Sequence, residues 1–466
     1  MITVEKGRIG PGGIVGWTEK GGMDWSRLNS AWIWQWKDGA WSDLSPVLAR
    51  MAANQLDKLQ ATPDLPILLQ AQDPIFYLGS VFAALISKRP IFIANPAWQT
   101  QEWKQVEQLL SPVTIWTDLV NLDLPSFDQA PRPKPGWIMI PTGGSSGQIQ
   151  FAIHTQETML AAIKSFQMGY GLNVIDSLNC LPLHHVSGLM PILRSFFTGG
   201  TVKLLPDWRT ITQLPPDSIQ NHILSLVPRQ LQALLDSGQA IPTLQALQVI
   251  LLGGGPSWQT LLEQARSQNL PLSPCYGMTE TLGLIARIPV VEFQETPTAA
   301  YQVLPDVSLD ILTPDPAGIG TIKLQTPALM VGYYPERLTT PGLITGDLGS
   351  LNGNQQLTLQ GRQQRLIITG GEKVQPEEVE VVIQNTGLVE DVYVFGQADA
   401  TWGEIVTAMY VPAGPGVTEA VLKAALAGQL SRYKHPQQWQ AVTKLPRTPQ
   451  GKLRYEQAQG LAKMSC

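Results

Sequence analysis

The amino-acid sequence predicts an α/β fold with a large N-terminal domain of layered α/β subdomains, a strand-rich subdomain and a small α+β C-terminal domain. Short apolar runs alternate with helix-like stretches as far as about residue 300, which is typical of α/β layers with a largely parallel sheet. From there to Gly361 the predicted strands are separated by Gly and Pro, and a second helix–strand alternation follows. A chain of 466 residues is long enough for two or three such domains.

In the first part of the chain, short apolar runs bounded by Gly, Pro or polar clusters predict strands. These runs are residues 136–140, 178–183, 201–206, 222–227, 247–255 and 270–277. Between several of them, residues 155–171 and 256–269 are expected to form helices.

The pattern changes in the last third of the chain. Strands are predicted within 301–313, 320–326 and 349–361, and Asn352-Gly353 predicts a hairpin turn. A helix and then a strand are expected within 376–396, followed by a helix within 418–430. We therefore predict a domain boundary near Gly361, with one domain at 1–361 and a second at 362–466.

Composition excludes several classes of protein. Hydrophobic residues make up 44% of the chain and charged residues 15%, which argues against disorder. Cys180, Cys275 and Cys466 are too few and too scattered for a disulfide framework or a thiolate metal site, which fits a reducing compartment. The N-terminus lacks the pattern of a signal peptide, and the most apolar stretch, 74–93, is interrupted too early to span a bilayer. We expect a cytoplasmic protein without an integral membrane segment.

Charge is unevenly distributed along the chain. The formal net charge of −5 argues against nucleic acid as a partner. From Lys423 to the end, however, eight basic residues stand against one acidic residue, Glu456. This segment is either a solvated basic face or a surface that meets a polyanionic small molecule, and it does not decide between the two by itself.

Residues 139–151, MIPTGGSSGQIQF, contain six consecutive small residues directly after an apolar run. Backbone N–H groups in such a loop can point into one concavity, and Thr142, Ser145 and Ser146 add hydroxyl donors, so the loop can bind phosphate oxygens. The common P-loop is excluded because no Gly-Lys-Ser/Thr follows. Taken alone, the segment is also consistent with a plain connection between two elements.

Several further segments occur in a fixed order with this loop. They are LLGGGPSW at 251–258, YGMTETLG at 276–283, TGDLG at 345–349, GRQQRLIITGGEKVQPEEVE at 361–380 and LPRTPQGKLR at 445–454. Together they resemble the adenylate-forming (AMP-binding) superfamily of acyl-CoA synthetases, peptide-synthetase adenylation domains and luciferases. The resemblance covers roughly residues 75–460. It implies the adenylate-forming fold, in which the small C-terminal domain rotates on the large one.

The resemblance implies ATP, Mg²⁺ and coenzyme A as ligands. Glu280 would bind Mg²⁺, a cation that prefers oxygen ligands, and Thr279 would hydrogen-bond the α-phosphate. Asp347 would accept the ribose hydroxyls, although an Asx-turn is the alternative. Arg362 would assist at the ribose or phosphate. The implied nucleotide and coenzyme positions are Thr142, Gly143, Gly144, Ser145, Ser146, Gly147, Gly253, Gly254, Gly255, Pro256, Tyr276, Gly277, Met278, Thr279, Asp347, Arg362, Gly371 and Lys373.

Lys452 matches the catalytic lysine of this family, which the small domain delivers to the junction between the substrate carboxylate and the α-phosphate. There it would stabilise charge in the adenylation transition state. The chain departs from the family at Gln150, where relatives usually have Lys in the phosphate loop, and at Gln364, where many have Asp at the hinge. The first departure bears on pyrophosphate contacts. The second concerns a hinge, which needs backbone freedom more than a carboxylate.

The segment 181–200, LPLHHVSGLMPILRSFFTGG, resembles the acyl-pocket motif and places His185 at the family's histidine position. Together with SLVPRQLQALL at 225–235, it resembles the 2-succinylbenzoate–CoA ligases of menaquinone and phylloquinone synthesis. Arg194 and Arg229 are near the expected position of this pocket, and an aromatic dicarboxylic acid would favour a cation or a hydroxyl there, so Ser187 and Arg229 are candidates. A surface arginine on a helix is the alternative for Arg229. The implied acyl-site residues are His185, Ser187, Gly188, Arg229 and Gly277.

The resemblance therefore predicts an ATP-dependent acid–CoA ligase that forms 2-succinylbenzoyl-CoA through an acyl-adenylate. The alternatives are another aryl- or acyl-CoA synthetase and, from a different class, a degenerate nucleotide-binding protein. Glu280, Asp347, Arg362 and Lys452 argue against the degenerate protein. The expected partners are small molecules, and the sequence leaves a homo-oligomer open.

Overall fold

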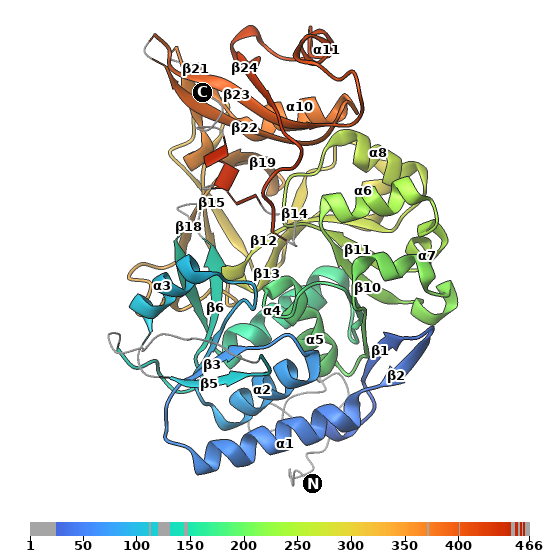
Figure 1. The fold of residues 1–466 in the computed structure, drawn as a ribbon, viewed down its shortest axis with the longest axis vertical. Helices are drawn as coiled ribbons and strands as arrows, with labels where there is room; N and C mark the ends of the chain where they lie inside the picture. Colours follow the sequence, from blue (N-terminus) through green and yellow to red (C-terminus); the bar gives the residue numbers. More distant parts are fainter. Residues whose placement is uncertain are drawn as a thin grey trace.

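The computed structural model describes residues 25–110, 113–119, 131–143, 148–370, 372–399, 401–448, 453–454, 457–458 and 460–461. The large domain is built on two sheets with helices between and around them, and the small domain sits at one end of it (Figure 1). Both the α/β layers and the small C-terminal domain expected from the sequence are present.

The first sheet has six strands in the order β17-β7-β6-β4-β3-β5. Its strands are β3 (Ile67–Gln70), β4 (Ile91–Ile93), β5 (Thr114–Thr117), β6 (Ile138–Gly143), β7 (Ile149–His154) and β17 (Gly332–Tyr333). The strands from β3 to β6 are parallel, while β7 pairs antiparallel with β6 and β17 pairs antiparallel with β7. The β6–β7 hairpin carries the predicted phosphate loop.

The second sheet is a continuous path of 13 strands. One part contains β1 (Ile33–Lys37), β2 (Ala40–Asp43), β8 (Asp176–Asn179), β9 (Val202–Leu204), β10 (His222–Leu226), β11 (Val249–Leu252) and β12 (Leu272–Met278). From β1 through β9, β8, β10 and β11 to β12 the pairing is parallel. The predicted parallel sheet is therefore confirmed for this part.

Beyond β12 the pairing in the same sheet becomes antiparallel. This part contains β13 (Gly283–Arg287), β14 (Tyr301–Val303), β15 (Ser308–Leu312), β16 (Gly320–Gln325), β18 (Leu343–Leu351) and β19 (Gln356–Arg362). The β18–β19 hairpin forms where Asn352-Gly353 predicts one, but the loop runs through 352–355 and its positive-φ residue is Gln355 (58°).

Helices cover both sheets. They are α1 (Ser45–Ala61), α2 (Pro74–Ser87), α3 (Thr100–Leu109), α4 (Gln156–Tyr170), α5 (Val186–Thr198), α6 (Pro228–Ser237), α7 (Ile241–Gln245), α8 (Gln259–Ser267) and α9 (Val290–Glu295). Short 3₁₀ turns are η1 (Ser26–Asn29), η2 (Trp208–Gln213), η3 (Pro216–Ile219), η4 (Thr279–Thr281), η5 (Gln363–Arg365) and η6 (Arg432–Lys434).

The largest core lies between the two sheets, where the apolar faces of α2, α4 and α5 meet. Phe82, Ile163 and Phe196 are fully buried there, one from each helix. A second core packs α6, α7 and α8 on the other face of the parallel strands. Helix α2 is the most apolar helix and has 14 residues; no helix in the described part of the chain is long and apolar enough to cross a lipid bilayer.

The small domain has its own core. It contains β20 (Ile367–Thr369), β21 (Glu372–Val374), β22 (Val389–Asp399), β23 (Gly403–Pro412), β24 (Gln438–Ala441), α10 (Pro376–Asn385) and α11 (Glu419–Ala425). Val379, Val394 and Leu422 are fully buried between the helices and the sheet. In Figure 1 this domain lies against β19 and the ends of α6 and α8.

Candidate nucleotide and acyl site

The site is centred on the end of β12, where the pairing in the long sheet changes from parallel to antiparallel. Gly277 lies here opposite Leu284, and a Cβ at this position would be 1.9 Å from the Gly283 carbonyl oxygen. Only glycine fits this crossing of two strands. Gly277 is nevertheless exposed on its other side, so a flat ligand can approach the backbone.

Three predicted nucleotide residues form one polar cluster. The Tyr276 hydroxyl donates to Asp347 Oδ2 at 2.7 Å, and Arg362 Nε lies 2.9 Å from Asp347 Oδ1. Asp347 and Arg362 are opposite each other in the β18–β19 ladder. Burial and the neighbouring Asp347 carboxylate raise the pKa of Tyr276, so its hydroxyl stays a donor. Each carboxylate oxygen keeps a second lone pair, which suits a pair of ribose hydroxyls.

Glu280 lies in η4, directly after β12. Its Oε1 accepts a hydrogen bond from the Tyr333 hydroxyl at 2.6 Å, and its backbone carbonyl accepts one from Met330 N at 2.8 Å. His154 Nε2 lies 2.9 Å from the Thr279 carbonyl oxygen, so β7 holds the same turn. Burial lowers the pKa of His154 to about 4, so it stays neutral at physiological pH.

The donor set at Glu280 fits a magnesium ion that is bound mainly through phosphate. In the described part of the chain no group of three metal-ligating side chains exists, so protein ligands alone would not hold the ion. Oε2 of Glu280 has no hydrogen bond to any described residue. One or two carboxylate oxygens with phosphates and waters are the usual arrangement for Mg²⁺.

The two strands that flank the predicted phosphate loop lie beside the turn that carries Glu280. Thr142 in β6 pairs with Gln150 in β7, and both strands contact η4. The two stems of the loop are therefore close to Thr279 and Glu280. Residues 144–147, which complete the predicted loop, lie outside the described residues.

The predicted adenine turn follows β11. Gly254 has a φ of +81°, and a Cβ at Gly253 would lie 3.2 Å from Cys275 Sγ on the neighbouring strand. Gly254, Gly255 and Pro256 are exposed. Because β11 and β12 are paired, this turn and Tyr276 lie at the same end of the sheet.

Three of the predicted acyl-site residues, His185, Ser187 and Gly188, lie at the start of α5, with His185 as its N-cap residue. The His184 and His185 rings are 4.4 Å apart, and burial lowers the pKa of His184 to about 4. A Cβ at Gly188 would be 2.2 Å from the Pro182 carbonyl oxygen, so glycine is required where the chain turns into the helix. Ser187 is exposed.

Arg194 lies on the same face of α5 as Ser187, two turns further along. Its guanidinium is buried 4.1 Å from the centre of the Phe166 ring, and burial lowers its pKa to about 10. Nε has no hydrogen-bond partner, and no acidic side chain of the described residues pairs with this cation. An added Cβ at Gly283 would be 3.3 Å from Arg194 Nη2, so the guanidinium lies next to the first residue of β13.

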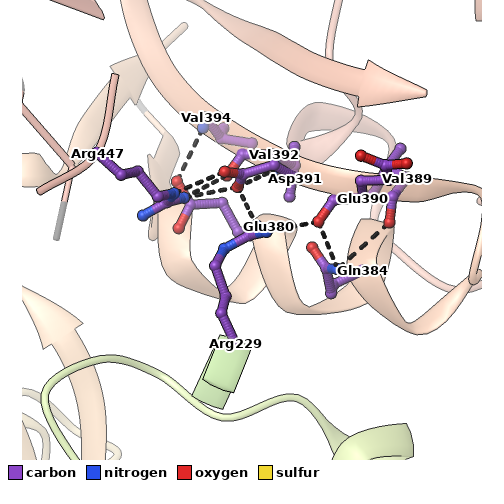
Figure 2. A network of polar contacts seen from close by, with 9 residues as sticks. All are labelled: Arg229, Glu380, Gln384, Val389, Glu390, Asp391, Val392, Val394 and Arg447. Carbon is purple, nitrogen blue, oxygen red and sulfur yellow. Dashed lines mark hydrogen bonds and ion pairs between the residues drawn. The ribbon is translucent and has the colours of Figure 1, made fainter. Parts of the chain in front are cut away.

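Arg229 is placed elsewhere. In this arrangement its side chain leaves α6 and crosses to the small domain, where it donates to the Glu390 carbonyl oxygen at 2.7 Å and pairs with Asp391 (Figure 2). Its expected role in the acyl site stays a prediction, and the structure gives it a different set of partners.

The small-domain residues are described in part. Lys452 and Gly371 lie outside the described residues, whereas Lys373 lies in β21 and is exposed. Next to Lys452, Leu453 forms a β-bridge with Arg447. Gln150 is exposed on β7.

Sequence reasoning did not identify Tyr333, His154 or Asp391. Tyr333 and Glu280 are 53 residues apart, His154 and Thr279 are 125 apart, and Asp391 and Arg447 are 56 apart. No short motif joins these pairs, so only the folded chain brings them together.

Comparison with known proteins gives matches over most of the chain. A family model described as AMP-binding enzyme matches residues 85–334, and one described as AMP-binding enzyme C-terminal domain matches residues 378–452. A 2-succinylbenzoate–CoA ligase of Staphylococcus epidermidis is 31% identical over 323 residues, which are 67% of this chain and 67% of that protein. A ligase of the same name from Listeria innocua is 33% identical over 323 residues, with the same coverage.

A solved structure has the same fold. The o-succinylbenzoate coenzyme A synthetase from Bacillus subtilis, in complex with ATP and magnesium ion, superposes with a TM-score of 0.76 at 23% identity. The superposition covers 92% of this chain and 96% of that chain. Since the first family model alone matches more than half of its residues, the chain belongs to the AMP-binding enzyme family.

Proposed function

We propose that this protein is an AMP-forming acid–CoA ligase that converts 2-succinylbenzoate, ATP and coenzyme A into 2-succinylbenzoyl-CoA, AMP and pyrophosphate. The observation that carries the proposal is the cluster at the end of β12, where Tyr276, Asp347 and Arg362 adjoin Thr279 and Glu280. It supplies an acceptor for ribose and an acidic ligand for a phosphate-bound cation in one place. The substrate rests on the relatives, which carry the name 2-succinylbenzoate–CoA ligase.

In the first half-reaction, the acid carboxylate attacks the α-phosphate of ATP and pyrophosphate leaves. Asp347 and Arg362 would fix the ribose, and Thr279 would hydrogen-bond the α-phosphate. Magnesium, when bound at Glu280 and the phosphates, neutralises part of the charge that repels the incoming carboxylate. Lys452 would stabilise the charge that develops on the bridging oxygen.

In the second half-reaction, the coenzyme A thiol attacks the acyl-adenylate and AMP leaves. Rotation of the small domain would bring the β20–β21 hairpin, with Gly370, Gly371 and Glu372, to the acyl site. Lys373 and the basic segment after Lys423 would then meet the phosphates of coenzyme A. His185, at the start of α5, would stand between the acyl carboxylate and the thiol.

A dicarboxylic substrate is supported by Arg194. A buried guanidinium without an acidic partner among the described residues is costly, and the second carboxylate of 2-succinylbenzoate would compensate it. Arg194 is therefore a better candidate for this role than Arg229, whose charge is already paired with Asp391.

The test is a panel of carboxylic acids assayed for ATP-dependent pyrophosphate release and for thioester formation. 2-Succinylbenzoate should give both, and benzoate or a fatty acid should give neither. Turnover of a different aryl or acyl acid in preference to 2-succinylbenzoate would support the alternative of another aryl- or acyl-CoA synthetase. ATP binding in calorimetry without activation of any acid would favour a degenerate nucleotide-binding protein, and failure to bind ATP would contradict both interpretations. A cytoplasmic location is part of the proposal.

A further inference from the structure

A cluster of charged side chains joins the two domains at the N-terminal end of α6. Arg229, the second residue of this helix, extends from the large domain to β22 of the small domain (Figure 2). Its Nη1 donates to the Glu390 carbonyl oxygen at 2.7 Å, and its Nη2 pairs with Asp391 Oδ1. Both partners lie in β22, 161 and 162 residues further along the chain than Arg229.

Asp391 is bound by a second arginine at the same time. Arg447 Nε lies 2.6 Å from Oδ2, and Arg447 Nη2 lies 2.7 Å from Oδ1, so the guanidinium spans both carboxylate oxygens. The Asp391 side chain is only 9% exposed, and Val392 N donates to its carboxylate as well. Fork-shaped pairs of this kind are strong and geometrically specific.

The two arginines differ in what domain rotation does to them. Asp391 and Arg447 both belong to the small domain, so their contact travels with it. Arg229 belongs to the large domain, so any rotation breaks its contacts with Glu390 and Asp391. Because Arg447 still pairs with the carboxylate after Arg229 leaves, Asp391 is never a buried charge without a partner. The contact across the junction can therefore open and close.

Arg447 also connects this cluster to the catalytic lysine segment. It forms a β-bridge with Leu453, the residue that follows Lys452. A hydrogen bond from Thr260 N in α8 to Asn385 Oδ1 in α10, at 3.2 Å, supports the same junction. Meanwhile Glu372 and Lys373, which would face the acyl site during thioester formation, are exposed. The arrangement therefore fits the first half-reaction and not the second.

We propose that Arg229 is a positioning residue that holds the small domain in its adenylation arrangement through Asp391. Its removal would shift the population of the small domain away from this arrangement and leave the Asp391–Arg447 pair in place. The proposal rests on the proposed function for the direction of the kinetic effect, but not for the conformational effect.

The kinetic test compares the half-reactions of Arg229→Ala with those of the parent. Acid-dependent exchange of pyrophosphate into ATP should fall about 10-fold, because fewer molecules occupy the competent arrangement. Formation of thioester from supplied acyl-adenylate and coenzyme A should be unchanged or faster. Arg229→Lys should restore part of the exchange rate. The matched control is Arg209→Ala, which removes an exposed arginine that pairs with Asp207 and lies over the neighbouring Trp208 ring, and it should change neither rate.

The conformational test needs no substrate. Spin labels at Asp236→Cys on α6 and Ala420→Cys on α11, both exposed positions, would report the distance between the domains in a background with Cys180, Cys275 and Cys466 replaced by Ala. Arg229→Ala should broaden this distance distribution, and Arg209→Ala should not. An unchanged distribution in Arg229→Ala, or an equal loss in both half-reactions, would overturn the proposal. A broadened distribution in a protein that activates no acid would refute the proposed function alone.

Discussion

Arg362 pairs with Asp347 in the large domain, and Arg365, only three residues later, pairs with Glu377 and Glu380 in the small domain. The side chains thus change sides within η5 (Gln363–Arg365). Gly361, the residue before Arg362, has a φ of +111°. Here the chain leaves one core and enters the other, and the domain boundary near Gly361 stays a prediction.

The first prediction concerns the ribose cluster. Asp347→Asn should raise the KM for ATP roughly 10- to 100-fold. The change removes the negative charge that pairs with Arg362 and that would accept hydrogen bonds from the ribose hydroxyls. Steady-state kinetics at saturating acid would measure this. Asp310→Asn, at an exposed position on β15, is the control and should leave the KM unchanged. An ATP affinity that does not respond to Asp347→Asn would exclude the ribose role.

The second prediction concerns the magnesium ligand. Glu280→Gln should slow adenylate formation about 100-fold or more and raise the magnesium concentration needed for half-maximal rate. Tyr333→Phe removes one neutral donor to Glu280 and should cost only about 2- to 10-fold. Titration of magnesium during pyrophosphate release would separate the two. Equal effects of both variants would mean that the tyrosine, and not the ion, organises this carboxylate.

The third prediction divides the reaction at Lys452. Lys452→Ala should reduce adenylate formation about 100- to 1,000-fold, because it removes a charge needed only in that transition state. Thioester formation from supplied acyl-adenylate should remain largely intact. Lys58→Ala, at an exposed position on α1, is the control and should change neither half-reaction. A comparable loss in both half-reactions would contradict the assignment.

The fourth prediction concerns the choice of acid. Arg194→Met should lower kcat/KM for 2-succinylbenzoate roughly 100-fold or more, the effect of losing one partner of a buried ion pair. For 4-oxo-4-phenylbutanoate, which lacks the ring carboxylate, the change should be about 3-fold at most. Without ligand, the variant should be at least as stable as the parent in thermal unfolding, because a buried charge is removed. A drop in stability with equal losses on both acids would mean that Arg194 only packs against Phe166.

The fifth prediction concerns stability at low pH. Burial lowers the pKa of His154 and of His184 to about 4, from an ordinary value of 6.5. Between these values the unfolded chain binds more protons than the folded one, so the stabilisation is full above pH 6.5 and is lost as the pH falls towards 4. Each histidine can contribute up to about 3 kcal/mol to this change. Urea unfolding at several pH values would measure the free energy of unfolding. Between pH 6.5 and 4 this free energy should fall less steeply with decreasing pH for His184→Asn than for the parent.

Local pattern predicted much of the fold. Strands β9, β10, β11, β15 and β16 and helices α4 and α8 lie within predicted segments, since the apolar runs and their Gly and Pro boundaries are properties of neighbouring residues. Strands β6, β8 and β12 only overlap theirs, and the elements before residue 136 are not predicted. The predicted hairpin at Asn352-Gly353 brings the strands of Asp347 and Arg362 together but does not give the register that places the two residues opposite each other. The positive φ at Gln355 does not follow, because the loop length depends on the register of the whole ladder.

The residues that the sequence did not place make contacts between distant segments. The segment 225–235 resembles an acyl-pocket segment and so suggests that role for Arg229, yet the partner of Arg229 is Asp391 in the other domain. Arg194 could be placed on a helix, but its burial beside Phe166 depends on how α4 and α5 pack. Periodicity gives the face of an element and not the neighbour that covers it.

The change of sides between Arg362 and Arg365 has a practical consequence. Each arginine keeps its acidic partners within its own half of the molecule, so a splice between Gln363 and Gln364 would divide none of these ion pairs. Small domains from relatives could be grafted at this joint with these ion pairs intact, as long as the graft keeps an acidic residue at the position of Asp391 to pair with Arg229.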